Sequence, residues 1–432
     1  MRWTSTKSKD IISDLREALF KGLAPDGGLF IPDSFPQYDA TGAETLIETA
    51  VGFLSPYVKP DIHEDDLRML LEKALDFTIP VINIKENLFI LELFHGPTLA
   101  FKDVGGRVMA GLLNHVYQDS EPLTILAATS GDTGSAVASA FLGMEKFRVI
   151  LLFPSGQVSS IQEQQLTTFG QNVTTLEVNG TFDDCQKLVK QAFSDEELRS
   201  IVHLTSANSI NIGRWLPQAI YYIHAWNQMQ ALVPDCKPVV SVPSGNLGNI
   251  AAGLVAMQHG AAFSRITAAC NNNKTFSDFI QLEKFRPRSS VRTVSNAMDV
   301  GNPSNFERIH AMYDGDITAI KKRIGASTHT DEATLETIRS VFEETGYILD
   351  PHTAVGYLGL MEQYERFGYD DEPGLILSTA HPAKFGDVIE KAIGRKPEMP
   401  ERLAACFRQE KKSMKLSNNY EDFSEFLRES VT

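Results

Sequence analysis

The sequence predicts an α/β protein with two open, doubly wound lobes and an additional N-terminal α+β unit. From about residue 87 onward, short apolar runs that end in Gly-, Ser- and Thr-rich turns alternate with amphipathic helical patterns. This alternation is typical of strand–helix–strand units in a parallel sheet. A Pro-punctuated break at 232–238 divides it into two series. The length of 432 residues also favours two or three domains over a single core.

The N-terminal residues, 1–90, lack this alternation until their end and are expected to form a separate unit. A segment rich in glycine and proline, 22–36, predicts tight turns. Mixed helical patterns follow it at 45–54 and 64–75. Turns followed by helices, without regular crossovers, indicate the α+β character of this unit.

The first lobe is expected over residues 91–232. Its first helix repeats apolar residues every four positions, close to the helical period, at Val104, Val108, Leu112 and Val116. The strands associated with this lobe are expected at 87–94, 123–128, 147–153 and 172–178, and a long helix is expected at 212–229.

The second lobe is expected over residues 233–395, and a polar, helical tail over 396–432. The strands of this lobe are expected at 238–243, 265–270 and 373–380, and its helices at 250–260, 331–346 and 383–394. In open α/β sheets, ligands bind beyond the carboxyl ends of the strands. The turns that follow the strands are therefore where chemistry is expected.

Composition argues against several classes of function. A formal net charge of −15 without any run of Lys or Arg argues against binding nucleic acid or an anionic membrane surface. The four cysteines, Cys185, Cys236, Cys270 and Cys406, are far apart and lack metal-binding spacing, so no metal site is expected. No apolar stretch is long enough for a signal peptide or a membrane span, which indicates a cytoplasmic protein.

The segment HGPTLAFKDVGG, 95–106, places Lys102 between a phenylalanine and an aspartate, where a Pro/Gly-rich turn gives way to a helix. A lone lysine at a helix start is most often a solvated charge. An apolar flank inside a crevice would instead keep part of the amine population unprotonated and nucleophilic. The interpretation of Lys102 therefore depends on what faces it.

The segment VPSGNLGNIAAG, 242–253, follows an expected strand and opens a helix. Glycine lets the backbone approach an anion closely, and the free N–H groups of the first helical turn point at it. The loop lacks the lysine of a nucleotide P-loop and the dinucleotide pattern G-x-G-x-x-G, which favours a monophosphate. A plain strand-to-helix turn would have the same composition, so the loop alone leaves both interpretations open. Together with a lysine in the other lobe it suits pyridoxal phosphate, whose aldehyde needs an amine and whose phosphate needs an anchor.

A second candidate anion cup, 128–138, carries Ser130 and Thr133 ahead of a helix. Asp132 in this cup is expected to cap the helix or to bond a hydroxyl. Arg214 could hold a phosphate bidentately, although an isolated arginine is more often a structural ion pair. Two separated cups plus an arginine suggest two phosphates in one crevice, one from the cofactor and one from the substrate.

A fourth turn, 377–387, places Thr379 at the end of a strand and Lys384 near the start of the next helix. Taken alone, this is an ordinary turn with a solvated lysine.

Five motifs in this order resemble the threonine synthase family: GLAPDGGLFIP, HGPTLAFKD, ATSGDTGSA, SGNLGN and STAHPAKF. The resemblance extends from the first residues to about position 395 and is closest to the longer fungal and enterobacterial type. It implies the fold type II of pyridoxal-phosphate enzymes, to which the tryptophan synthase β subunit also belongs.

The resemblance also implies a role for each residue singled out above. Lys102 would carry the cofactor through a Schiff base, and Thr379 would face the pyridine nitrogen. The cofactor phosphate would be bound by Gly245, Asn246, Leu247, Gly248 and Asn249. The substrate phosphate would be bound by Ser130, Thr133, Arg214 and Lys384. The implied reaction is the last step of threonine biosynthesis, conversion of O-phospho-L-homoserine and water to L-threonine and phosphate, in a monomer or homodimer.

The chain departs from the family pattern at STKS, 5–8, where Ser-Thr-Arg-Gly is usual, and at Lys274, where an acid is common. Neither site touches Lys102 or the glycine loop. Three alternatives stay open: a phospho-lyase of the same fold that releases a 2-oxo acid, a serine/threonine dehydratase without use for a substrate-phosphate site, and a two-lobed small-molecule binding protein.

Overall fold

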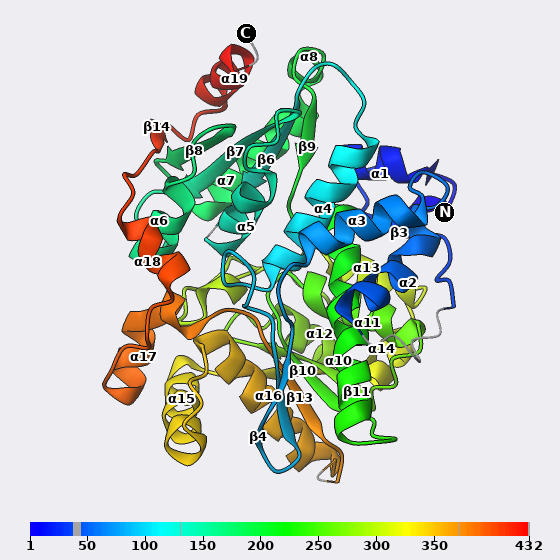
Figure 1. The fold of residues 1–432 in the computed structure, drawn as a ribbon, viewed down its shortest axis with the longest axis vertical. Coiled ribbons are helices and arrows are strands. Elements are labelled where there is room, and N and C mark those ends of the chain that lie inside the picture. The colour runs from blue at the N-terminus through cyan, green and yellow to red at the C-terminus, as the bar shows by residue number, and fades with distance from the viewer. Residues whose placement is uncertain (38–44, 130, 370, 431–432) are drawn as a thin grey trace.

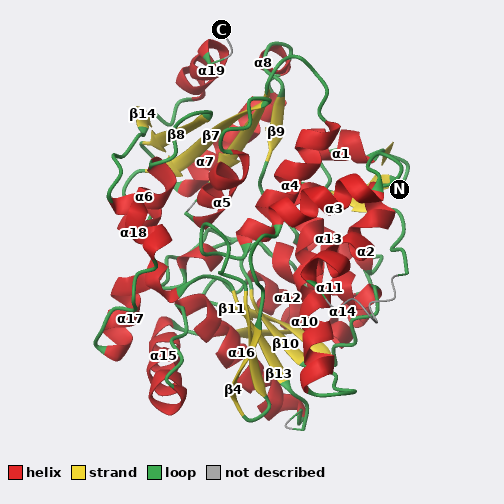
Figure 2. Cartoon of the chain, viewed as in Figure 1, coloured by secondary structure: helices red, strands yellow, loops and turns green. Residues whose placement is uncertain are grey.

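The computed structural model describes residues 1–37, 45–129, 131–369 and 371–430. Within these residues the strands form three sheets, of three, five and six strands. The five-stranded sheet lies above the six-stranded sheet in Figures 1 and 2, and the N-terminal helices flank them on the right. The predicted α/β class with two lobes and an N-terminal unit is confirmed. No helix in the described part of the chain combines the length and the apolar character needed to cross a membrane.

The N-terminal unit holds a small antiparallel sheet in the order β2–β1–β3 and three helices. Its elements are β1 (Trp3–Ser5), β2 (Ile12–Ser13), α1 (Leu15–Lys21), β3 (Phe30–Pro32), α2 (Leu46–Val58) and α3 (Glu64–Ala74). The helix α2 begins at a capping box: the Thr45 hydroxyl accepts from the Glu48 N–H, and the Glu48 carboxylate accepts from the Thr45 N–H. The two helices expected in this unit are confirmed.

The five-stranded sheet is parallel throughout, in the order β14–β8–β7–β6–β9. Its strands are β6 (Leu123–Ala128), β7 (Phe147–Pro154), β8 (Val173–Val178), β9 (Leu204–Ser206) and β14 (Met414–Leu416). The helices of this lobe are α4 (Lys102–Val116), α5 (Asp132–Phe141), α6 (Ser160–Thr167), α7 (Phe182–Ser194) and α8 (Glu196–Arg199). Every residue of β6 is buried, as expected for a parallel strand with helices over both faces.

The six-stranded sheet has the order β12–β11–β10–β13–β5–β4 and is parallel except for β4. Its strands are β4 (Val81–Lys85), β5 (Leu88–Glu92), β10 (Val239–Pro243), β11 (Arg265–Cys270), β12 (Ile324–Thr328) and β13 (Gly374–Ser378). The helices that follow the chain through this lobe are α11 (Gly248–Gln258), α12 (Thr275–Leu282), α13 (Phe306–Met312), α14 (Ile317–Arg323), α15 (Asp331–Thr345), α16 (Pro351–Phe367) and α17 (Gly386–Ile393). Short 3₁₀ turns lie at Asn296–Met298 and Pro382–Phe385.

The strand expected at 87–94 forms as β5, but its partner is β13, so it belongs to the six-stranded sheet. The next element, α4, packs against α5 and α9 (Ile212–Trp215) of the other lobe. The chain therefore crosses between the two sheets in the turn that ends at Lys102. Sequence periodicity identifies a strand but not its partner, and here the partner lies nearly three hundred residues away in the chain.

The prediction of a single long helix at 212–229 is wrong in one respect, because the helix is interrupted. The structure has α9 (Ile212–Trp215), a 3₁₀ turn at Leu216–Gln218 and α10 (Ala219–Leu232). Pro217 lies in the 3₁₀ turn, where its missing N–H prevents a continuous α-helical ladder. The tail, expected to be helical, forms α18 (Glu401–Phe407) and α19 (Tyr420–Glu429) and adds the strand β14 beside β8.

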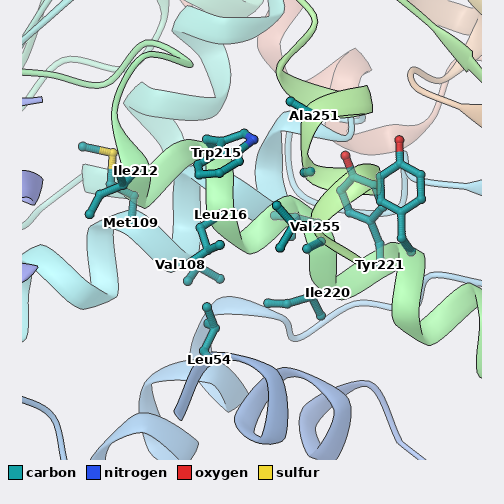
Figure 3. Packing of buried hydrophobic residues seen from close by; sticks show 14 of the residues in the cluster. Leu54, Val108, Met109, Ile212, Trp215, Leu216, Ile220, Tyr221, Ala251 and Val255 are labelled. Atoms are coloured by element: carbon teal, nitrogen blue, oxygen red, sulfur yellow. The ribbon is translucent and has the colours of Figure 1, made fainter. Parts of the chain in front are cut away.

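One large apolar cluster joins the N-terminal unit to both lobes. Figure 3 shows Leu54 of α2 facing Val108 of α4 and Ile220 of α10, with Val255 of α11 above Ile220 in this view. All four side chains are fully buried. Removing this area from water is the main stabilising contribution to the contact between these helices. Both α4, which begins with Lys102, and α11, which begins at the glycine loop, pack against the 3₁₀ turn at Leu216–Gln218, so the core fixes their relative position.

Candidate active site

A cavity of about 1800 Å³ lies where the turns after β5, β6, β10 and β13 converge. This is the crevice beyond the carboxyl ends of parallel strands, where ligands bind in such folds. The site residues that the sequence predicted and that line it are Lys102, Thr133, Arg214, Gly245, Asn246, Leu247, Gly248, Asn249 and Thr379. Ser130 lies outside the described residues. Lys384 is described but does not line the cavity.

Lys102 is the first residue of α4, and its side chain is only 16% exposed. Its Nζ lies 4.0 Å from Asp132 Oδ2 and 4.8 Å from the centre of the Phe101 ring. Burial lowers the pKa of Lys102 to about 8; the nearby Asp132 carboxylate opposes this and the Lys384 ammonium adds to it. With this pKa, roughly a tenth of the amine is unprotonated at pH 7, far more than for an ordinary lysine, and the unprotonated form is the nucleophile.

Thr379 follows β13 directly and is buried beside the lysine turn. Its carbonyl accepts the Phe101 N–H at 2.9 Å, and Ala100 forms an isolated β-bridge with Ala380. These backbone contacts join the turn before α4 to the end of β13. They bring Thr379 and Lys102 to the same wall of the cavity, although the two residues are far apart in sequence.

The glycine loop runs from the end of β10 into α11. Leu247 adopts a left-handed conformation with φ of 60°, which turns the chain so that α11 begins at Gly248. A Cβ added at Gly245 would lie 2.8 Å from Met298 Cα, so only glycine fits against the 296–298 turn. The first N–H groups of α11 have no partner within the helix and face the cavity end of the loop.

Asn249 extends the same cup with a side-chain donor. Its Oδ1 accepts hydrogen bonds from the hydroxyls of Tyr221 and Tyr222, each at 2.7 Å, which fixes the orientation of the amide. Its buried Nδ2 has no partner among the described residues. The loop therefore presents both backbone and side-chain N–H groups without any acid nearby on the loop.

Arg214 of α9 is a buried cation on the cavity wall. A Cβ at Gly105 of α4 would overlap the Arg214 carbonyl oxygen, so glycine allows α4 and α9 to pack this closely. The Nη1 group of Arg214 donates to the Ala207 carbonyl at 2.7 Å, whereas its Nε has no partner among the described residues. Burial lowers the pKa of Arg214 to about 10, opposed by the Asp103 carboxylate, so the guanidinium stays charged at neutral pH. A charged donor without an anion fits a phosphate site.

Of the two roles expected for Asp132, the helix cap is wrong, whereas the bond to a hydroxyl stays a prediction. Gly131 occupies the N-cap position of α5 without a side-chain cap. Asp132 instead forms a buried ion pair with Lys384, with 2.8 Å between Oδ1 and Nζ, and accepts from Gln162 Nε2 at 3.1 Å. Lys384 also donates to the Thr98 carbonyl at 2.9 Å. Despite the cost of burial, the positive charges of Lys384 and Lys102 hold the pKa of Asp132 far below its usual range.

His352 also lines the cavity, and sequence reasoning missed it. Its Nδ1 lies 2.7 Å from Asp350 Oδ1, and its Nε2 accepts the Ala297 N–H at 3.2 Å. These contacts fix the tautomer and hold the 296–298 turn against Gly245. The signal in the sequence is an aspartate two residues before a histidine at a helix start, where the Asp350 side chain caps α16.

The donor set fits pyridoxal phosphate. The cavity combines a buried amine of lowered pKa with a glycine cup and several buried polar atoms that lack partners among the described residues. Those that line it are Arg214 Nε, Asn249 Nδ2, Asn208 Oδ1 and Asn296 Oδ1. Unpaired buried polar atoms are costly unless a ligand satisfies them. No group of three or more potential metal ligands is found in the described ranges.

Comparisons with known proteins agree with this chemistry. Family models described as "Pyridoxal-phosphate dependent enzyme", "Threonine synthase N terminus" and "Threonine synthase, C-terminal" match residues 79–379, 2–75 and 353–427. The threonine synthase of Serratia marcescens is 42% identical over 393 residues, which are 90% of each chain. That of Schizosaccharomyces pombe is 34% identical over 460 residues, 90% of this chain and 89% of the other.

Solved structures show the same likeness over the whole chain. The threonine synthase of Escherichia coli superposes with a TM-score of 0.91 at 38% identity, covering 100% of both chains. The pyridoxal-phosphate-bound threonine synthase of Brucella melitensis superposes with a TM-score of 0.91 at 34% identity, covering 100% of this chain and 99% of the other.

Proposed function

The chain belongs to the threonine synthase family of pyridoxal-phosphate-dependent lyases, and we propose that its cleft converts O-phospho-L-homoserine and water to L-threonine and phosphate. The observation that supports this proposal is that a glycine loop with an unpaired amide donor and a buried arginine with an unpaired Nε line one cavity with a buried amine. The glycine loop at 245–249 suits the cofactor phosphate, and Arg214 suits a second phosphate, that of the substrate. A serine/threonine dehydratase has no use for the second site.

When bound, pyridoxal phosphate supplies an aldehyde that condenses with amines and a ring that withdraws electrons from the carbons next to the substrate nitrogen. Lys102 Nζ is the group placed to take the α-proton and to exchange protons at the neighbouring carbons, because its lowered pKa lies close to neutrality. Thr379 would face the ring nitrogen, and its hydroxyl, unlike a carboxylate, would leave that nitrogen unprotonated, which would moderate electron withdrawal and favour elimination and replacement.

The substrate phosphate is assigned to Arg214, Thr133, Ser130 and Lys384. Arg214 and Thr133 line the cavity, so they can reach it directly. Lys384 has to exchange Asp132 for the phosphate, since its ammonium is now paired with that carboxylate. The phosphate released from the γ-carbon stays next to the β-carbon and is in position to activate the incoming water. The cytoplasmic location and the monomeric or homodimeric state stay predictions.

Product analysis tests the proposed function. Purified protein supplied with pyridoxal phosphate and O-phospho-L-homoserine is expected to form threonine and phosphate in equal amounts. A phospho-lyase of the same fold would release 2-oxobutyrate in place of threonine, and a binding protein would leave the substrate unchanged. Either of these results would overturn the assignment.

The rate of cofactor capture by the apoenzyme is expected to follow the pKa of Lys102. Burial lowers this pKa to about 8, so the unprotonated, nucleophilic fraction rises with pH and levels off above that value. The rate constant for capture of pyridoxal phosphate, measured by stopped-flow absorbance from pH 6 to 10, is therefore expected to plateau above about pH 8.5. A continued tenfold rise per pH unit up to pH 10 would show a lysine of ordinary pKa. Pyridoxal, which lacks the phosphate, is the control for titration of the ligand.

A further inference from the structure

A fully buried guanidinium lies behind the glycine loop. Arg308 of α13 is 0% exposed and has no carboxylate within ion-pair distance among the described residues. It donates to the carbonyl oxygens of Phe30, Ser209 and Ile210 and to the side chain of Asn305. Its Cζ also lies 4.3 Å from the centre of the Trp215 ring, and these contacts offset part of the cost of burying a charge without a counter-ion. A nearby anion would offset more of that cost.

The orientation of Asn305 follows from Arg308. A guanidinium can only donate, and Arg308 Nη1 lies 2.6 Å from Asn305 Oδ1. The Nδ2 group of Asn305 must therefore point the other way, where it lies 3.2 Å from Ser209 Oγ and 3.1 Å from the Asn246 carbonyl oxygen. The amide is fixed as a donor to Ser209 and to the glycine loop.

The orientation of Asn246 is fixed independently. The Ser304 backbone N–H, which can only donate, lies 2.6 Å from Asn246 Oδ1. The Nδ2 group of Asn246 is therefore the donor to Ser209 Oγ, at 2.7 Å. Ser209 thus accepts two hydrogen bonds from two amides whose directions are both set by obligate donors.

The hydroxyl proton of Ser209 is left for a ligand. A serine oxygen has two lone pairs and one proton, and both lone pairs of Ser209 Oγ are occupied. No acceptor for the proton is found in the described part of the chain. Ser209 lines the cavity, and a Cβ added at Gly248 would lie 3.4 Å from Ser209 Cβ. The hydroxyl therefore lies beside the first residue of α11, at the glycine cup.

We propose that Ser209 is a further ligand of the cofactor phosphate, donating its hydroxyl proton to it, and that Arg308 is the positioning residue that enforces this direction through Asn305. This inference rests on the proposed function only in taking the glycine cup as the phosphate site. The phosphate accepts a hydrogen bond strengthened by its charge, and it is also the anion that partly compensates the buried guanidinium. A loop without a lysine of its own thereby obtains positive charge from a residue sixty positions further along the chain.

The test separates phosphate binding from attachment to Lys102. The apoenzyme is titrated with 4′-deoxypyridoxine 5′-phosphate, which has the phosphate but no aldehyde, and separately with pyridoxal, which has the aldehyde but no phosphate. Ser209→Ala is expected to raise the dissociation constant of the phosphorylated probe roughly 10- to 100-fold and to leave that of pyridoxal unchanged. The ³¹P resonance of the bound probe is expected to shift in the same variant. Equal weakening of both probes, or no weakening, would overturn the proposal.

Two further variants test the link through Arg308. Asn305→Asp keeps the acceptor for Arg308 but replaces the Nδ2 donor by a carboxylate oxygen, so the Ser209 hydroxyl can donate its proton to that oxygen instead of to the phosphate. The variant is therefore expected to bind the phosphorylated probe more weakly and pyridoxal equally well. Arg308→Lys keeps a positive charge but lacks the planar guanidinium that fixes Asn305. Its effect on the affinity for the phosphorylated probe is expected not to add to that of Ser209→Ala in the double variant. Full additivity would reject the positioning role.

Ser241→Ala is the matched control, since this buried hydroxyl on β10 donates to the Gly356 carbonyl and does not line the cavity. It is expected to lower the melting temperature without changing the affinity for either probe. Failure of the inference about Ser209 can be distinguished from failure of the proposed function. If the enzyme forms threonine but Ser209→Ala leaves its affinity for the phosphorylated probe unchanged, only this inference is rejected. If Ser209→Ala selectively weakens binding of the phosphorylated probe but the wild-type protein forms no threonine, only the proposed reaction is rejected.

Discussion

Replacing Lys102 by alanine is expected to lower kcat for threonine formation by roughly 10³-fold or more. The variant loses both the amine that attaches the cofactor and the base placed to move the α-proton. The fold is expected to survive, because Asp132 keeps its ion pair with Lys384 and a buried charge is removed. Steady-state kinetics and thermal melting measure the two expectations. A variant with near wild-type kcat would remove Lys102 from the mechanism.

Three controls distinguish lost chemistry from lost charge. Borohydride reduction of the wild-type enzyme, followed by peptide mapping, is expected to label Lys102, whereas the alanine variant should bind the cofactor without label. Lys187 lines the same cavity but is exposed, and Lys187→Ala is expected to change kcat less than twofold. Added methylamine is expected to restore part of the activity of Lys102→Ala, because it replaces the missing amine.

The alternation of strands and helices, read from the sequence, predicted the two lobes and the turns that carry the site. This succeeds because a buried parallel strand is a continuous apolar run, and the turn that follows it must lie at the same edge of the sheet as its neighbours. The alternation could not show that β5 pairs with β13, since strand pairing depends on packing between distant segments rather than on local pattern. It also missed the 3₁₀ turn at Pro217, where one absent N–H outweighs the apolar periodicity around it.

Candidate residues could be found in the sequence, but their partners could not. Asp132 and Lys384 are separated by about 250 positions, and neither residue carries a local signal that the two form a buried ion pair. Taken alone, Lys384 resembles a solvated lysine, yet its side chain is 0% exposed. Ser209 lies in the segment SANSIN and carries no local signal of a role, because only the hydrogen-bond directions around it show that its proton is unused.

The charges around the cavity suggest how the site discriminates among substrates. Lys102 and Lys384 both lie near the single carboxylate of Asp132, while Arg214 has no ion-pair partner among the described residues. The site therefore contains a buried cation, Arg214, that is not paired with a carboxylate before a ligand arrives. An anionic substrate is attracted to such a site, and a neutral amino acid such as serine gains nothing from Arg214.

Replacing Arg214 by alanine is accordingly expected to lower kcat/KM for O-phospho-L-homoserine by roughly 10²–10³-fold. The change removes a charged, buried donor whose Nε has no other partner, so the substrate phosphate loses its principal cation. Arg214→Lys keeps the positive charge but not the planar guanidinium, so its kcat/KM is expected to lie between those of the wild-type enzyme and Arg214→Ala. Initial rates of phosphate release over a range of substrate concentrations give both kcat and KM.

The decisive comparison uses a substrate without a phosphate. Any dehydration of L-serine by the same enzyme would require Lys102 and the cofactor but not the second anion site, so Arg214→Ala is expected to change its rate less than threefold. Loss confined to the phosphorylated substrate assigns Arg214 to the leaving group, because a general defect in folding or cofactor binding would reduce both rates equally. An equal fall in both would instead place the guanidinium among the residues that support the cofactor, and the second phosphate site would then have to be sought elsewhere in the cavity.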